Sequence, residues 1–100
     1  MGNATTCEAL LAKLKDFKEQ RGEEFGLTSI GIFGSFARGD AREDSDVDIV
    51  FDTSIPNLFR ASRMRQDLED LLGQPVDLLQ LRGLTNPRLK ARVEREAVYA

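Results

Sequence analysis

Two aspartates one residue apart, Asp46 and Asp48, follow the pair Gly34–Ser35 after ten intervening residues. Carboxylate oxygens are hard ligands that suit Mg²⁺, which often binds only one or two protein carboxylates together with substrate phosphates. Backbone N–H groups near a glycine and a serine hydroxyl can hold phosphate oxygens. The two pairs together indicate chemistry on a phosphate-linked group supplied by a nucleoside triphosphate.

Asp46 and Asp48 lead into an apolar, β-branched run, residues 47–51, which is typical of a strand. Because side chains alternate across a strand, both aspartates are expected on one face, about 6.5–7 Å apart along the chain, with the apolar residues facing the core. Two carboxylates this close raise each other's proton affinity, and a bound Mg²⁺ would remove that penalty. An exposed acidic strand start is the alternative interpretation of this pair alone.

The segment before the aspartates predicts an anion site. Residues 29–33 are typical of a buried strand, and residues 35–38 are typical of a short helical turn that Gly39 would end. A strand that stops at Gly34 and opens a helix N-terminus presents free N–H groups and a favourable dipole to an anion. An ordinary turn is the alternative for a Gly–Ser pair taken alone.

Arg38 lies inside this phosphate motif and has two interpretations. It could contact a triphosphate, or it could form a local ion pair with Asp40 or Asp44. The acidic residues of the segment make a negative patch that would repel a nucleotide unless Mg²⁺ is bound.

The combination of Gly34–Ser35, the ten-residue gap and Asp46–x–Asp48, with Arg38–Gly39 and Ser45 between them, resembles the nucleotidyltransferase superfamily of the DNA polymerase β type. The small size of the chain is similar to that of the minimal nucleotidyltransferases, the MNT partners of HEPN/MNT toxin–antitoxin pairs. The resemblance covers nearly the whole chain in element order, and its specific part is residues 33–51. It implies an α+β, polymerase β-like nucleotidyltransferase fold with a small mixed sheet.

The family expects a third carboxylate on a later strand, and Asp77 in the apolar run 75–81 is the candidate. An Asp inside such a run is unusual without a partner or a metal, although it could instead cap a turn at the strand start. The resemblance implies that Asp46 and Asp48 hold two Mg²⁺ ions. It also implies that Asp77 binds the ion nearest the attacking hydroxyl and is a candidate to accept the hydroxyl proton.

The resemblance further implies transfer of AMP from ATP, bound by Gly34, Ser35 and Arg38, to a tyrosine hydroxyl of a cognate HEPN ribonuclease toxin, which the modification would silence. The expected setting is a prokaryotic cytoplasm. Two alternatives remain open: a nucleotidyltransferase for an antibiotic or other small molecule, which usually carries a further substrate-binding domain, and an antitoxin that acts by docking alone. The presence of all three carboxylates argues against the docking-only alternative.

Length and composition set bounds on these hypotheses. One hundred residues predict one domain, and the resemblance implies that it is a single minimal nucleotidyltransferase domain over residues 1–100. A net charge of −3 does not favour direct nucleic-acid binding. One Cys and no His exclude a disulfide framework, a Cys/His zinc site and histidine-based catalysis, so a general base must be a carboxylate or a metal-bound hydroxide. No apolar run approaches the ~20 residues of a membrane span, and no signal peptide is expected.

Three helices and three strands are expected, in the order α-β-turn-β-α-β-α. Thr5–Glu8 matches the capping-box pattern at the start of the first helix, which is expected to end near Gly22. The second helix is expected over 54–72, entered through Pro56, and the last begins at Asn86–Pro87. The residues expected to face the core are Leu10, Leu11, Leu14 and Phe17 in the first helix, Leu58, Phe59, Leu68, Leu71 and Leu72 in the second, and Leu89, Val93, Ala97 and Tyr99 in the last.

This order favours an α+β domain with the helices on one side of a small mixed sheet. Three strands leave the sheet edges exposed, which suggests that a partner or a second copy covers them in a homodimer or hetero-oligomer. Basic residues within 60–65 and 88–95 are expected on solvated helix faces. A docking surface for an acidic protein or an RNA-binding toxin is the alternative for these two groups.

Overall fold

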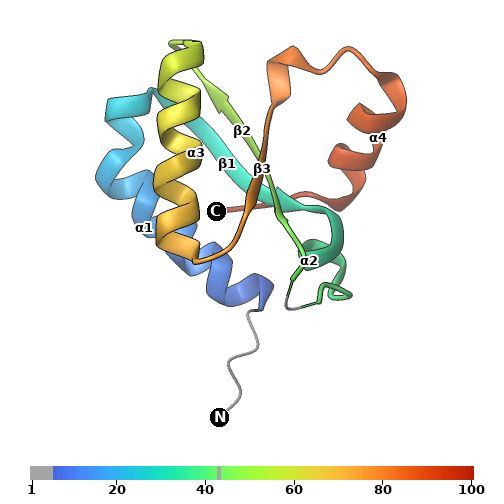
Figure 1. Cartoon of the computed structure of the whole chain (residues 1–100). Helices are drawn as coiled ribbons and strands as arrows, with labels where there is room; N and C mark the ends of the chain where they lie inside the picture. The colour runs from blue at the N-terminus through green and yellow to red at the C-terminus, as the bar shows by residue number, and fades with distance from the viewer. Residues whose placement is uncertain (1–5, 43) are drawn as a thin grey trace.

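A mixed four-stranded sheet with the spatial order β3-β2-β1-β4 lies at the centre of the structure (Figure 1). The computed structural model describes residues 6–42 and 44–100. Strands β1 and β2 are antiparallel, β3 runs parallel to β2, and β4 runs antiparallel to β1 on its other side. The strands are β1 (Leu27–Phe33), β2 (Val47–Thr53), β3 (Val76–Gln80) and β4 (Val98–Tyr99). The predicted α+β fold with a small mixed sheet is confirmed.

Helices cover both faces of this sheet, not one face as predicted (Figure 1). The helices are α1 (Cys7–Phe25), α2 (Gly34–Arg38), α3 (Leu58–Leu72) and α4 (Pro87–Glu96), with the 3-10 turn η1 (Leu81–Gly83) after β3. Helices α1 and α3 pack on the face that includes Ile32 and Ile49. Phe33 and Val50 point to the other face because side chains alternate along a strand, and Val93 of α4 buries them there. The one-sided prediction was wrong because it left these two apolar residues without cover.

Each of the three long helices begins at a side chain that caps it. Thr6, Asn57 and Asn86 accept hydrogen bonds from backbone N–H groups of the first turn, at 2.9–3.3 Å. The prediction for Asn86 is confirmed. Helix α3 begins at Leu58, later than its predicted start at residue 54. The ring of Pro56 disfavours the helical conformation in the residue before it, so the helix does not include that residue. Thr5, which was predicted to start a capping box, lies outside the described residues.

Helix α1 ends at Phe25, past its predicted end near Gly22. Phe25 is buried and stacks on Phe17 with the ring centroids 5.8 Å apart, so the helix stays regular until this ring has reached the core. Gly26 then takes the left-handed conformation, with φ +62°, that ends the helix.

The inward face of α3 consists of Met64, Leu68 and Leu72 at four-residue spacing. Leu58 and Phe59 are 81% and 85% exposed, and Leu71 is exposed as well, so the prediction that these three residues face the core was wrong. A helix turns by roughly 100° per residue, which carries Phe59 to the side of α3 opposite Leu68, about 180° away. Leu58 lies roughly 80° from Leu68, at the margin of the inward face, and is exposed in the first turn of the helix.

The chain ends in β4, which was not predicted because two residues are too few to give an alternating pattern. Helix α4 ends at Glu96, and Val98 and Tyr99 pair with the middle of β1. Gly31 of β1 is needed there, since a Cβ atom would lie 2.6 Å from the carbonyl oxygen of Val98. Tyr99 is therefore exposed on an edge strand and not in the core as predicted.

Side chains of α3 partly cover the other edge of the sheet. The N–H group of Val76 in β3 donates to the Glu69 carboxylate at 3.0 Å, and its carbonyl oxygen accepts from Nε of Arg65 at 3.1 Å. On the other side, β4 pairs with the middle of β1 and is itself a short edge strand of two residues. The argument for a homodimer or hetero-oligomer from bare sheet edges is correspondingly weaker, and the oligomeric state stays a prediction.

Candidate active site

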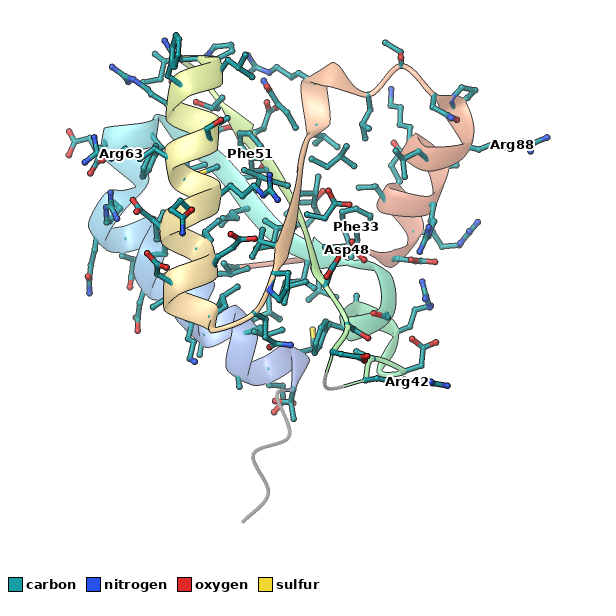
Figure 2. All side chains as sticks on the ribbon, viewed as in Figure 1. Phe33, Arg42, Asp48, Phe51, Arg63 and Arg88 are labelled. Atoms are coloured by element: carbon teal, nitrogen blue, oxygen red, sulfur yellow. The ribbon has the colours of Figure 1, made fainter. Side chains whose placement is uncertain are left out.

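The three predicted carboxylates lie at the same end of two neighbouring strands. Asp48 is the second residue of β2 and pairs in parallel register with Asp77, the second residue of β3. Paired residues on adjacent strands share a face, with the strands about 4.8 Å apart, so these carboxylates are neighbours on the face opposite α1 and α3. Asp46 immediately precedes β2. Asp46 and Asp77 are exposed, whereas Asp48 is half-buried beside Phe33 (Figure 2).

This arrangement disfavours the ionised form of Asp48 and so raises its pKa. Burial raises the pKa of Asp48 above its ordinary value, and the negative charges of Asp77 and Asp46 raise it further. The positive charges of Arg92 and Arg38 act on the pKa in the opposite direction. The negative charges of Asp77 and Asp46 therefore disfavour ionisation of Asp48, and a bound cation would relieve this repulsion.

The raised pKa of Asp48 predicts that this carboxylate contributes less to the stability of the metal-free protein as the pH rises. The folded state keeps the Asp48 proton to a higher pH than the unfolded state does, so folding takes up a proton between pH 3.8 and the raised pKa. This contribution to the free energy of unfolding is fully present below the lower value and lost above the higher one. Urea unfolding in EDTA from about pH 3.5 to about pH 7 should show Asp48→Asn gaining stability relative to the wild type. A difference that is constant with pH would contradict the prediction.

Gly34 brings the backbone of α2 against the Asp48 carboxylate. Its φ of +75° lies in the left-handed region that favours glycine, and a Cβ atom there would lie 2.9 Å from Cγ of Asp48. The N-cap residue, Phe33, has no hydrogen-bonding side chain, so it does not occupy the first N–H groups of α2. Ser35 follows in the first turn and is half-buried. The predicted phosphate turn and the Asp48 carboxylate therefore lie side by side.

Arg38 forms ion pairs with Asp40 at 3.3 Å and with Glu96 of α4 at 3.0 Å. The pair with Asp40 was one of the two interpretations of Arg38, and the triphosphate contact stays a prediction. Sequence reasoning missed Glu96 and also Arg92, whose Nε lies 3.3 Å from the Glu96 carboxylate. Their i,i+4 spacing is typical of a helix ion pair, but nothing in the sequence brings that pair to Arg38.

The donor set of the site fits Mg²⁺. Carboxylate oxygens are ligands that Mg²⁺ prefers, and Asp48 and Asp77 are neighbours that act on each other electrostatically. Within residues 6–42 and 44–100, no three acidic or cysteine side chains are gathered closely enough to hold one ion as they stand. The two-ion site of Asp46, Asp48 and Asp77 therefore stays a prediction.

Comparisons with known proteins agree with this geometry. Residues 13–100 match the family described as nucleotidyltransferase domain. The chain is 43% identical over 95 residues to protein adenylyltransferase MntA of Thermococcus cleftensis, and the alignment covers 94% of this chain and 95% of the relative. A sheet that sets paired aspartates beside a Gly–Ser turn, together with these matches, defines the class of protein: the chain belongs to the nucleotidyltransferase family.

Two solved structures share the fold. A minimal nucleotidyltransferase superposes with a TM-score of 0.79 at 38% identity, covering 97% of this chain and 98% of the other. A toxin–antitoxin complex with AMP-PNP contains a chain that superposes with a TM-score of 0.72 at 27% identity, covering 89% of this chain and 72% of that chain. This chain is accordingly a nucleotidyltransferase of the minimal type, and the resemblance predicted from its motifs is confirmed.

In the part of the chain that the structure describes, no helix is long and apolar enough to cross a membrane.

Proposed function

We propose that this chain transfers AMP from Mg·ATP to a tyrosine hydroxyl of a cognate HEPN-type toxin and thereby neutralises the toxin. The observation that carries the proposal is the parallel register of Asp48 with Asp77. Gly34 lies against Asp48, so the carboxylates and the turn predicted to bind phosphate are close together. The curated relative is named a protein adenylyltransferase, and one solved relative is a toxin–antitoxin complex with AMP-PNP. These names support a nucleotide substrate and a protein acceptor.

The residues of this chain bind and orient the reactants. The N–H groups of Gly34 and Ser35 and the Ser35 hydroxyl hold phosphate oxygens of ATP at the start of α2. Asp46, Asp48 and Asp77 would hold two Mg²⁺ ions, which supply charge stabilisation at the reacting phosphate when bound. Position and electrostatics, and not a covalent enzyme intermediate, supply the rate enhancement.

The reaction exchanges one P–O bond for another. The tyrosine oxygen bonds to the α-phosphorus, the bond from that phosphorus to the oxygen shared with the β-phosphate breaks, and pyrophosphate leaves. Asp77 accepts the tyrosine proton, because it is exposed on an edge strand and lies beside Asp48. The chain contains no histidine, so a carboxylate takes this role.

A protein acceptor suits the charge of this chain better than a nucleic acid does. With a net charge of −3, the chain attracts a phosphate backbone weakly, whereas neutralisation of phosphates normally dominates nucleic-acid affinity. We place the reaction in a prokaryotic cytoplasm, where ATP, Mg²⁺ and the toxin would meet.

Coexpression with the protein encoded by the neighbouring gene tests the proposal. The intact mass of that protein should rise by one or more AMP units on a tyrosine, and the gain should vanish with Asp46→Asn. An unmodified neighbour together with AMP transfer to an aminoglycoside would favour the small-molecule alternative. An unmodified neighbour that Asp46→Asn still neutralises would favour the docking-only antitoxin.

Ser35→Ala should weaken Mg·ATP binding by about tenfold or more, since a hydrogen bond to a charged oxygen is worth roughly 1.5–3 kcal/mol. The half-buried hydroxyl is removed without changing the turn, so the midpoint of thermal unfolding should stay close to the wild-type value. Calorimetric titration with Mg·ATP measures the affinity. Ser62→Ala, at an exposed serine of α3, is the control and should bind as the wild type does. Unchanged affinity in Ser35→Ala would mean that Ser35 only shapes the turn.

A further inference from the structure

Glu96, the last residue of α4, joins two arginines from different elements. Its carboxylate accepts hydrogen bonds from Nη1 of Arg38 in α2 at 3.0 Å and from Nε of Arg92 in α4 at 3.3 Å. The Glu96 side chain is 15% exposed, whereas those of Arg38 and Arg92 are 40% and 43% exposed. The carboxylate therefore lies beneath two guanidinium groups that remain open to solvent.

Helix α4 is fixed against the strand that leads into the phosphate turn. Val93 is buried against Phe33, which immediately precedes Gly34. Arg92 is next to Val93 in the chain, and its guanidinium shares the Glu96 carboxylate with Arg38. Arg38 belongs to α2, as do Gly34 and Ser35, so the Arg92 side chain is held close to the helical turn proposed to hold the phosphates.

We propose that Arg92 binds the β- and γ-phosphates of the nucleotide together with Arg38, and that Glu96 is a positioning residue that holds both guanidinium groups in place. This inference rests on the proposed function. A guanidinium has five N–H donors, of which Glu96 takes one from each arginine and Asp40 takes Nε of Arg38. The remaining donors form the planar fork that suits phosphate oxygens.

The charge of the site favours such an arginine pair. A triphosphate must approach a face that already carries Asp46, Asp48 and Asp77, and guanidinium groups bring positive charge that persists at every working pH. Although burial raises the pKa of Glu96, the hydrogen bond from Arg92 and the charges of both arginines lower it overall. Glu96 therefore stays ionised and offsets the repulsion between the two guanidinium groups.

Binding of ATP and of AMP by the whole chain separates this role from a purely structural one. Arg92→Gln should weaken Mg·ATP binding by roughly 10- to 100-fold, the worth of hydrogen bonds to a charged group, and leave AMP binding unchanged. Glu96→Gln should shift ATP affinity in the same direction by a smaller factor. Arg88→Gln is the matched control, because Arg88 is exposed on the same helix and points away from Asp48 (Figure 2). Calorimetric titration measures all four proteins.

Each outcome decides between the inference and its rivals. Wild-type ATP affinity in Arg92→Gln, or an equal loss of ATP and AMP binding, would overturn the inference and leave the proposed function standing. Tighter ATP binding by Glu96→Gln would overturn the positioning role, because the carboxylate would then be competing with the phosphates. If Arg92→Gln does not fold, Arg92→Lys keeps the charge, loses the fork and should give an intermediate affinity. A wild-type chain that binds neither nucleotide would reject the proposed function itself.

Discussion

Replacing Asp48 by Asn should lower the rate of AMP transfer by at least about a thousandfold while the fold stays intact. Asn keeps the volume of Asp and lacks its charge, and charge stabilisation at a reacting phosphate is worth several kcal/mol. Asp48 lies in register between Phe33 and Asp77, so no other carboxylate occupies its position on the sheet. Labelled ATP, Mg²⁺ and the acceptor protein give the rate, and circular dichroism checks the fold.

Asp52→Asn is the matched control for this experiment. Asp52 lies on the same strand and the same face as Asp48, and its carboxylate pairs with Arg82 at 3.0 Å. Asp52 lies four residues, or about 13 Å, along the strand from Asp48 and therefore away from the proposed metal site, so the folded control should transfer AMP at close to the wild-type rate. Transfer at the wild-type rate by folded Asp48→Asn, or equal losses in both variants, would refute the role given to Asp48.

The part of the site that the sequence could predict is the part built from local geometry. Alternation along β2 puts Asp48 on one face and its apolar neighbours on the other, and this holds whatever packs on the sheet. The strand that stops at Gly34 likewise follows from the glycine and the apolar run before it. The position of Asp77 was harder to predict, because its place beside Asp48 depends on the parallel register of β3 with β2. The expectation of a third carboxylate came from the family resemblance.

The contacts that α4 makes with the candidate site could not be predicted from the sequence, because they depend on tertiary packing. Arg92 and Glu96 look like an ordinary exposed helix pair until Val93 is seen to pack on Phe33 and bring the end of the helix to Arg38. The prediction that Leu58 and Phe59 face the core failed for a different reason. Both are apolar, yet Phe59 lies on the side of α3 opposite the inward stripe, and Leu58 lies at the margin of that stripe in the exposed first turn, so composition suggested a burial that the structure does not give them.

Gly34→Ala should lower AMP transfer by at least about a hundredfold, the size of loss that a displacement of about 1 Å at a reacting centre can cause. The new Cβ atom would lie 2.9 Å from Cγ and 3.2 Å from Cβ of Asp48, too close for either side chain to stay in place. The Asp48 side chain is the movable partner, so its carboxylate should rotate away from the phosphate turn. The protein should therefore still fold, at a cost in stability, and lose activity.

Gly39→Ala separates the steric clash at Gly34 from the backbone cost. Gly39 has a φ of +84°, comparable with the +75° of Gly34, but a Cβ atom there would meet nothing within 4 Å. Both variants should lose about 1–2 kcal/mol of unfolding free energy for the left-handed conformation, measured by urea unfolding, while only Gly34→Ala should lose AMP transfer. Equal activity in the two variants would show that the contact between Gly34 and Asp48 does not matter for catalysis. A large loss in Gly34→Ala alone would show that the reaction depends on the backbone at Gly34, where the proposed phosphate turn closely approaches the Asp48 carboxylate, and not merely on a left-handed glycine in this segment.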